Sequence, residues 1–426
     1  MRLTGILGII AILFLAWAFS KDRRTVNWKA VGWGLGLQTL FALFVFVIPA
    51  GSKVFLFINK LVVGVLSCAS AGMEFVFGNL AVAPGNPGSM GYFFAFQALP
   101  SIVFFAALVG VLYYFGIMQA VIKGFAWVFT KLMRISGAES LSASSNIFVG
   151  VESSLIIKPY LKNMTRSELN TVLTVGMATV ASSMLAVYIM VLKDQFPTIA
   201  GHLVSASIMN APAAIVLSKL LYPEKNEPET LGLHIKPHYD KPNSLFESIL
   251  DSANSGVKLI VGIAAMLLAF LGLVALVDKI MILIGHPLNN LFNSNIDFSL
   301  QGLLGYLFYP LTWLIGIPAE DVGVISRIIG ERIILSEVTA FQDLAHVIAQ
   351  GSISARSVVI TTYALTGFAH IASVAIFVGG YAALVPARAG DLSRLGFRAL
   401  FGATLATLLS ASIAGIFYQN VSILAM

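Results

Sequence analysis

Gly367-Phe-Ala-His-Ile-Ala-Ser-Val374 lies inside a long apolar run, yet it carries a histidine and a serine. A second stretch, Gly176-Met-Ala-Thr-Val-Ala-Ser182, stands 191 positions earlier. Five of the seven shared positions agree in identity or in chemical class. Small residues mixed with polar ones are typical of helix contacts inside a membrane protein rather than of a lipid-facing surface. The two stretches are therefore predicted to be paired halves of one transport site.

The composition of the chain excludes the soluble globular class. Of its 426 residues, 58% are hydrophobic and only 11% are charged, whereas soluble domains carry about 25% charged residues. Only helices and closed barrels satisfy the backbone inside a bilayer, and a helix needs roughly 20 mostly apolar residues to cross it. Because the apolar runs are long and do not alternate with polar residues, we expect an all-α integral membrane protein.

The apolar runs predict eight transmembrane helices. They cover Leu3 to Phe19, Val31 to Ile48, Leu99 to Ile122, Leu173 to Leu192, His202 to Leu221, Val257 to Ile284, Thr361 to Val385 and Leu400 to Phe417. The first run lacks a strongly basic start and a small-residue cleavage site, so we interpret it as a membrane helix rather than a signal peptide. The mixed segment between Ile48 and Gln97 is interpreted as interfacial helices and a loop.

The charged residues predict how the chain is oriented in the membrane and which partners it has, and the cysteine content bears on disulfides and metals. Lys and Arg gather in the short loops on one side, which places these loops in the cytoplasm and both termini outside the inner (plasma) membrane. The same distribution explains the net charge of +6 by contact with the lipid bilayer, so no nucleic-acid partner is expected. A single cysteine, Cys68, excludes an intramolecular disulfide. The sequence has no zinc-like cluster and predicts no organic cofactor.

Two segments carry a polar break in an apolar context and are predicted to be re-entrant hairpins. The first covers Ser136 to Tyr160, and the second covers Gly302 to Leu344 with its break at Pro318-Ala-Glu-Asp321. Irregular backbone at membrane depth is tolerated only inside protein or beside a wet cavity. The resulting division of the chain is 1–98 (N-terminal and interfacial helices), 99–135 (scaffold helix and interfacial segment), 136–222 (first hairpin repeat, the transport domain), 223–300 (cytoplasmic loop and scaffold helix) and 301–426 (second hairpin repeat and C-terminal helices).

The offset of 191 residues also relates the two hairpins. It places Ser145-Asn146 of the first on Ser336-Glu337 of the second. An odd number of crossings between the halves would invert one relative to the other. This is the inverted repeat of secondary transporters, whose substrate sites lie near the midplane where helices are broken.

This geometry would bring together a set of polar side chains, and each also has a simpler interpretation. A carboxylate inside a membrane costs about 3 kcal/mol on insertion scales, which favours a functional role for the intramembrane glutamate. A hairpin tip can reach water, serines often only close helix contacts, and a histidine can be a packing residue. The candidate residues are Asn146, Glu152, Ser182, Ser183, Glu337, His370 and Ser373.

Several long motifs, in order, resemble the concentrative nucleoside transporter family. The stretch from Leu304 to Pro318 looks like the family's second-hairpin signature, and Ser336-Glu-Val-Thr-Ala-Phe341 looks like its Asn-Glu-Phe-Val-Ala-Tyr motif. Gly367-Phe-Ala-His-Ile-Ala-Ser373 is similar to Gly-Phe-Ala-Asn-Phe-Ser-Ser, and the segment from Val378 to Pro386 also fits. The resemblance runs from about Leu99 to the end of the chain.

The resemblance implies an architecture and a site. The family is similar in having eight core spans, two opposed hairpins, a homotrimeric scaffold and an elevator-type movement. It implies that Glu337 accepts hydrogen bonds from ribose hydroxyls, with Ser373 and Phe368 beside it. The remaining residues implied for the site are Val151, Glu152, Ser153 and His370 around the nucleoside, and Asn146, Val149 and Ser183 around a sodium ion.

Two departures from the family pattern affect this site. The first hairpin reads Gly150-Val-Glu152-Ser-Ser154, one residue shorter than the usual Gly-Gln-Thr-Glu or Gly-Gln-Ser-Glu pattern and without its glutamine. Base recognition is therefore expected to differ. His370 replaces the usual asparagine; a neutral histidine keeps a donor and an acceptor, and it can also become charged.

The leading hypothesis is a sodium-driven symporter that imports nucleosides. A proton-coupled carrier is the alternative within transport, with His370 and Glu152 as the titrating pair. An intramembrane enzyme is disfavoured because no nucleophile stands beside a base. A channel is disfavoured because paired hairpins suit alternating access.

Overall fold

The computed structural model describes residues 2–150, 152–239 and 241–419, and the regular elements in this part of the chain are helices. The all-helical class expected from the sequence is therefore confirmed. The first nine α-helices are α1 (Arg2–Ala18), α2 (Trp28–Phe46), α3 (Pro49–Phe77), α4 (Phe94–Gln97), α5 (Ser101–Tyr114), α6 (Ile117–Met133), α7 (Gly137–Asn146), α8 (Ser153–Ile156) and α9 (Arg166–Ala178). The others are α10 (Ser182–Leu192), α11 (Ile199–Leu221), α12 (Leu245–Phe292), α13 (Leu300–Leu314), α14 (Ala319–Ile334), α15 (Glu337–Ala349), α16 (Ala355–Leu365), α17 (Ile371–Leu384) and α18 (Ala389–Phe417).

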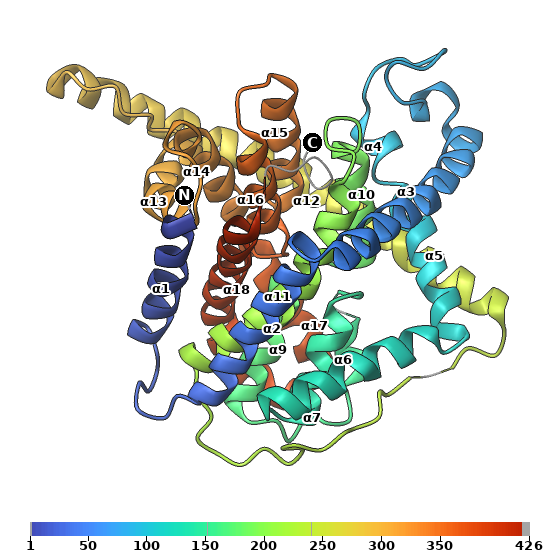
Figure 1. The fold of residues 1–426 in the computed structure, drawn as a ribbon. Helices are drawn as coiled ribbons and strands as arrows, with labels where there is room; N and C mark the ends of the chain where they lie inside the picture. Colours follow the sequence, from blue (N-terminus) through green and yellow to red (C-terminus); the bar gives the residue numbers. More distant parts are fainter. Residues whose placement is uncertain (1, 151, 240, 420–426) are drawn as a thin grey trace.

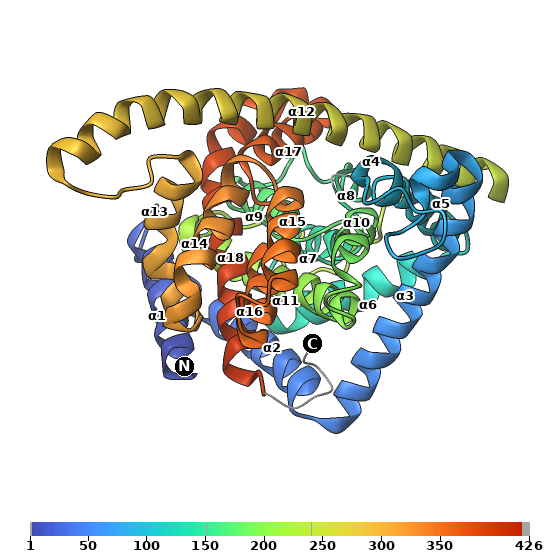
Figure 2. The ribbon, with the colours of Figure 1, turned by 90° about the horizontal axis from the view of Figure 1, so that it is seen from above.

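The core of the molecule is built from α9, α11 and α18. These helices pack against one another, and α1, α2 and α16 add to the same bundle (Figure 1). The most apolar window of α11 is 89% buried, whereas that of α12 is only 6% buried. Viewed from above, α12 runs along one edge of the molecule, where it packs against α5 (Figure 2). A long apolar helix with so little buried surface must face lipid or another protein surface.

Seven helical units in the described part of the chain are long and apolar enough to cross a membrane. Six of them match predicted spans, and the seventh is Pro49–Ala81. The first predicted span corresponds to α1, which has 17 residues, and the seventh contains α17, which has 14. Both fall below the length of a single spanning helix, so the count of eight crossings stays a prediction.

Two segments before the first hairpin differ from their predicted form. The interfacial region was expected to contain several helices, but residues Pro49–Phe77 form one uninterrupted helix; its interfacial position stays a prediction. The third predicted span is wrong as a single helix, because it breaks after Tyr114. Gly116 there adopts a left-handed conformation with φ of 78°, which glycine reaches without steric cost. The amphipathic helix α6 then starts in a new direction.

The fourth and seventh predicted spans are also wrong as continuous helices, because each breaks within the repeated stretch. The first break separates α9 from α10, and the second separates α16 from α17. At each break, a backbone amide donates to a group other than the carbonyl four residues before it. Ser182 N donates to Phe148 O at 2.9 Å, and His370 N donates to Ser373 Oγ at 3.3 Å. The repeat therefore marks two unwound segments.

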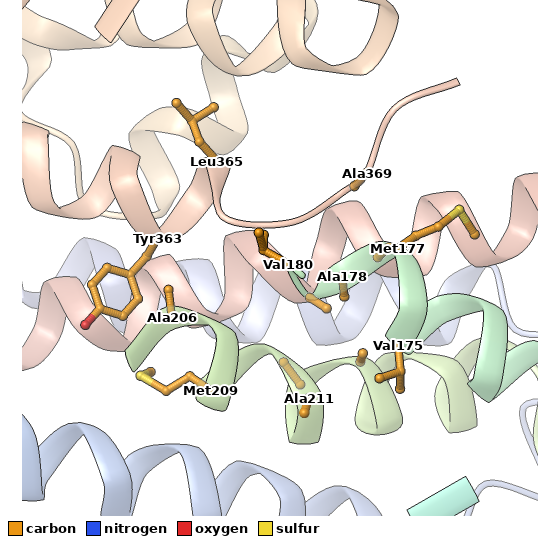
Figure 3. Packing of buried hydrophobic residues seen from close by; sticks show 14 of the residues in the cluster. Val175, Met177, Ala178, Val180, Ala206, Met209, Ala211, Tyr363, Leu365 and Ala369 are labelled. Atoms are coloured by element: carbon orange, nitrogen blue, oxygen red, sulfur yellow. The ribbon is translucent and has the colours of Figure 1, made fainter. Parts of the chain in front are cut away.

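The two unwound segments lie against each other. Phe368 N donates to Thr179 O at 3.3 Å, and Asn210 Nδ2 on α11 donates to Ala178 O at 3.0 Å and also to Thr366 O. A Cβ on Gly367 would stand 2.7 Å from Ala178 O, so this close approach needs glycine. Figure 3 shows the segment from Leu365 to Ala369 passing over Ala178 and Val180, with α11 beneath them.

The two predicted hairpin segments are built from short helices and breaks, and their re-entrant course stays a prediction. In the first, α7 ends at Asn146 and α8 begins at Ser153. The predicted second hairpin contains three helices, because the chain turns at Ile315–Pro318 and breaks again between α14 and α15. The offset of the repeat relates Asn146 to the second of these breaks, where Glu337 begins α15. The Pro318–Asp321 segment is only the turn from α13 to α14.

Capping and charge pairing hold the base of the first hairpin. Ser136 and Glu139 form a reciprocal capping box at the start of α7, and Thr165 and Glu168 form another at the start of α9. Lys219 Nζ on α11 lies 2.5 Å from Glu139 Oε1, and its side chain is 6% exposed. The buried pair fixes the start of α7 against the end of α11, because separating its charges is costly. Lys219 Nζ also donates to Ser167 Oγ at the start of α9, at 3.0 Å.

We predict that Asn210→Ala destabilises the protein, because it leaves two carbonyl oxygens unpaired in the core. The expected cost is about 1–3 kcal/mol for each carbonyl. Asn170→Ala is the matched control, since the equally buried Asn170 donates at 2.7 Å to Ser218 Oγ, which keeps Thr171 as a partner. Thermal unfolding of the purified protein in detergent measures both. Equal midpoints for the two variants would contradict the bridging role of Asn210.

Candidate substrate site

The carboxylate of Glu337 is the centre of the candidate site. It is 1% exposed and follows Ser336, whose side chain caps α15. Its Oε1 accepts a hydrogen bond of 2.6 Å from the Tyr188 hydroxyl on α10. Its Oε2 lies 3.3 Å from His370 Nε2. An acidic side chain is favourable at this position, because the N-terminal turn of a helix carries partial positive charge.

His370 reaches Glu337 from the break between α16 and α17. Its ring is fully buried and lies 4.8 Å from the Phe368 ring, measured between centroids. Ser373 is also buried, and its Oγ donates to His370 O at 2.6 Å. The structure thus brings Glu337, His370 and Phe368 together, while the hydroxyl of Ser373 holds the backbone that carries His370.

Tyr188 was not among the residues singled out from the sequence. It is fully buried, and its ring stacks on Phe341 with centroids 4.6 Å apart. A buried tyrosine usually finds a hydrogen-bond partner, so a tyrosine in the middle of an apolar run was a usable signal. The sequence could not reveal that the partner would be Glu337, because the two residues lie 149 positions apart.

Asn146 sits at the end of α7 with an oxygen that has no partner. Its Nδ2 donates to Ser142 O at 2.9 Å, whereas Oδ1 is buried without a hydrogen bond. Nearby, Ser182 Oγ donates to Phe148 O at 2.8 Å and ties the first hairpin to the start of α10. Amide, hydroxyl and carbonyl oxygens are the ligands that hard cations prefer, so the unpartnered oxygen fits a bound ion.

A cavity of about 340 Å³ lies between the first hairpin, α5, α10 and α12. Val149, Glu152 and Ser183 line it, and Glu152 is exposed. This volume is at the lower end of ligand pockets, which are about 300–1,000 Å³. Val151 lies outside the described residues. Ser153 is buried with its hydroxyl unpaired, and it does not line the cavity.

The predicted residues form two neighbouring groups rather than one open pocket. Glu337, His370 and Phe368 belong to the buried group, and none of them is among the described residues that line the cavity. Helix α10 connects the groups, since Ser183 stands at its start and Tyr188 further along it. The predicted titrating pair of His370 and Glu152 is not a contact in the described structure; His370 faces Glu337 instead.

The chemistry of the buried group favours a neutral, hydroxyl-bearing ligand. A carboxylate accepts hydrogen bonds from hydroxyl groups, and a neutral imidazole can donate one and accept one. The aromatic rings of Phe368 and Tyr188 add apolar surface beside these polar atoms. A few convergent polar groups in an apolar setting are the usual composition of a small-molecule site.

Comparison with known protein families covers most of the chain. The family described as Na+ dependent nucleoside transporter C-terminus matches residues 202–415. Its N-terminal counterpart matches residues 7–80, and a family described as nucleoside recognition matches residues 95–195.

Individual relatives agree with this assignment. Sodium/nucleoside cotransporter 1 of Rattus norvegicus is 38% identical over 98% of this chain, which spans 64% of the length of that relative. An uncharacterized transporter of Haemophilus influenzae is 36% identical over 97% of both chains. Relatives that the chain matches in this way are transporters rather than enzymes.

Solved structures show the same fold. The transporter CNTnw in an inward-facing substrate-bound state superposes with a TM-score of 0.88, at 33% identity and 97% coverage of both chains. An outward-facing variant of CNTnw gives the same score at 32% identity, covering 98% of this chain and 97% of the other. The chain therefore belongs to the Na+-dependent nucleoside transporter family, the concentrative nucleoside transporters, and is a multi-pass membrane transporter.

Proposed function

We propose that this protein is a symporter that imports nucleosides across the inner (plasma) membrane, driven by a sodium gradient. The observation that carries the proposal is the cluster of Glu337, Tyr188 and His370 at the junction of two broken helices. Discontinuous helices that meet at the interface of two repeats are where secondary transporters hold substrate and coupling ion. The family assignment supplies the substrate class.

The buried carboxylate would recognise the sugar. Ribose hydroxyls donate to Glu337, His370 offers a donor and an acceptor, and Phe368 packs against the nucleoside. Ser373 keeps the segment of His370 in place through its bond to the His370 carbonyl. We propose that the base lies toward the first hairpin, near Val151, Glu152 and Ser153, where the cavity offers space.

The sodium ion would bind at the end of α7. We propose the Asn146 side chain, the carbonyl of Val149 and the Ser183 hydroxyl as its ligands. The buried and unpartnered Oδ1 of Asn146 supports this choice, because a bound cation would satisfy it. An ion there would order the tip of the first hairpin beside the cavity.

Alternating access would follow from movement of the hairpin repeats, 136–222 and 301–426, against the N-terminal and interfacial helices and the scaffold regions 99–135 and 223–300. The exposed apolar surface of α12 supports its role in an elevator-type scaffold and in a homotrimer. Both termini would lie outside, as the distribution of Lys and Arg suggests.

Proton coupling is the second candidate. The observation that favours it is the distance of 3.3 Å between His370 Nε2 and Glu337 Oε2. A histidine that gains a proton beside a carboxylate would change the charge of the substrate site. Uptake is measured across pH at fixed sodium, and again with a pH gradient and no sodium. Only a proton-coupled carrier accumulates nucleoside under the second condition.

Membrane vesicles containing the protein are expected to accumulate labelled uridine or adenosine when sodium is higher outside. Replacing sodium by choline should abolish the accumulation, because the ion gradient supplies the driving force. Vesicles without the protein are the control. Absence of uptake under both sodium and proton gradients would overturn the proposed function.

Glu337→Gln is expected to reduce nucleoside uptake by at least about tenfold, because a hydrogen bond to a charged group contributes about 1.5–3 kcal/mol. The variant keeps an acceptor for Tyr188, so its thermal stability and its elution as a trimer should be unchanged. Glu320→Gln, on the exposed surface of α14, is the control. Wild-type uptake in Glu337→Gln would show that the carboxylate is not the sugar ligand.

Asn146→Ala is expected to raise the sodium concentration needed for half-maximal uptake, because it removes an oxygen ligand of the ion. Ser144→Ala is the matched control on the same helix, since Ser144 Oγ bonds only within α7, to Ser140 O at 2.7 Å. Uptake is measured at saturating nucleoside over a range of sodium concentrations. An unchanged sodium dependence in Asn146→Ala would contradict the proposed ion site.

A further inference from the structure

Helix α6 carries a basic and aromatic face that lies outside the site described above. Its buried side packs against α5, α7 and α2. On the other side, Lys123, Trp127 and Lys131 follow one another at intervals of four residues, which aligns them on one stripe of a helix. Arg134, the C-cap of α6, comes three residues later. All four residues are exposed, and Trp127 is exposed to 49%.

The positive charge of this stripe has no acidic partner in the described part of the chain. Helix α6 contains no acidic residue, and its basic side chains form no ion pair there. Lys131 Nζ instead lies over the Trp127 ring, 4.6 Å from its centroid. By contrast, the exposed Lys225 pairs with Asp22 at 2.7 Å. The basic stripe of α6 is therefore free to bind an anion from outside the chain.

The position of α6 favours an anion that belongs to the membrane. The helix lies across one end of the molecule, transverse to α1 and α18, and the segments 19–27 and 222–239 run along the same end (Figure 1). Ile117 and Val121 form a second exposed stripe on α6, apolar and exposed to 49% and 37%. A transverse helix that exposes basic, aromatic and apolar side chains is typical of a membrane interface.

These three kinds of side chain fit the parts of an anionic phospholipid. Ammonium and guanidinium groups bind a headgroup phosphate, a tryptophan is favourable at headgroup depth, and the apolar stripe would contact acyl chains. A small soluble anion would use the charges alone and leave the apolar stripe uncovered. The general enrichment of Lys and Arg on one side of a membrane explains the side, but it does not explain their alignment with Trp127 on one helix face.

We propose that the stripe formed by Lys123, Trp127, Lys131 and Arg134 is a binding surface for anionic phospholipids in the leaflet on that side of the membrane. This inference goes beyond the proposed function, because binding requires neither sodium nor nucleoside. The bound lipid stabilises the protein through the packing of α6. Phe125 on α6 contacts Phe148 of the first hairpin segment, with ring centroids 5.9 Å apart.

Thermal unfolding of the purified protein in neutral detergent tests the proposal at fixed ionic strength. Phosphatidylglycerol should raise the unfolding midpoint, and phosphatidylcholine should not. In the double variant Lys123→Gln with Lys131→Gln, half-maximal stabilisation should need at least about tenfold more phosphatidylglycerol, because each basic residue near an anionic lipid surface contributes about fivefold in affinity. Both side chains are exposed, so the variant should fold.

Two further double variants separate this surface from the net charge of the protein. Lys53→Gln with Lys60→Gln removes the same charge from exposed positions on α3 and should leave the response to phosphatidylglycerol unchanged. Lys123→Arg with Lys131→Arg keeps the charge and should stay within about twofold of the wild type. Equal losses in the α3 and α6 glutamine variants would overturn the proposal.

Tryptophan fluorescence in proteoliposomes gives a second readout that places the lipid at α6. Brominated phosphatidylglycerol should quench the wild type more strongly than brominated phosphatidylcholine does. This excess should decrease in Trp127→Phe, because Trp127 lies within the proposed surface. An unchanged excess would show that the anionic lipid binds elsewhere, and this test remains decisive if a lysine variant does not fold.

The remaining outcomes concern the chemistry of the ligand. Inorganic phosphate and glycerol 1-phosphate, at the concentrations used for the lipid, should give no stabilisation that depends on Lys123 and Lys131. If they reproduce the effect of phosphatidylglycerol, the surface binds a small anion and the lipid assignment is overturned. Equal stabilisation by phosphatidylglycerol and phosphatidylcholine would also overturn it. Neither result depends on whether the protein transports nucleosides, so failure of the proposed function is a separate outcome.

Discussion

The side-chain amide of Asn210 is the contact on which the arrangement of the site depends. Inside a membrane each backbone polar group needs a partner within the protein, and breaking a helix frees carbonyls that would otherwise be paired. Two helices break here, and Asn210 donates to one freed carbonyl from each, Ala178 O and Thr366 O. One residue on the buried helix α11 thereby lowers the free-energy cost of both breaks, and it holds the two broken helices together.

The site follows from this junction. The second unwound segment is fixed on the first, so the side chains of Phe368 and His370 start from defined positions. From there His370 reaches Glu337 in the first turn of α15. The same junction orients α10, which presents Tyr188 to the other oxygen of Glu337. Unwound backbone, a helix start and a buried tyrosine meet where the two segments of the 191-residue sequence repeat lie against each other.

The sequence predicted the repeat but not its conformation. The glycine, alanine and serine pattern identified Gly176–Ser182 and Gly367–Ser373 as a pair, yet their apolar neighbours favoured continuous helices. Because of Pro318, the second break was predicted at a segment that is only the turn between α13 and α14. The repeat offset pointed correctly to Ser336. Asn210 and Tyr188 were missed because each is a polar residue in an apolar run whose partner lies on another helix. Partners of this kind become visible only when the helices are packed.

The replacement of asparagine by His370 changes how the carboxylate is held in the described state. An imidazole reaches further than an amide, and here Nε2 already stands beside Glu337 Oε2 while Tyr188 occupies Oε1. A nucleoside that binds Glu337 must therefore share or displace these two groups. Release of His370 and Tyr188 from the Glu337 carboxylate can be coupled to rearrangement of the two helix breaks, because His370 lies at one break and Tyr188 follows the other. In the proposed site, substrate affinity would be the difference between hydrogen bonds gained and lost, so His370 would tune binding rather than simply add to it.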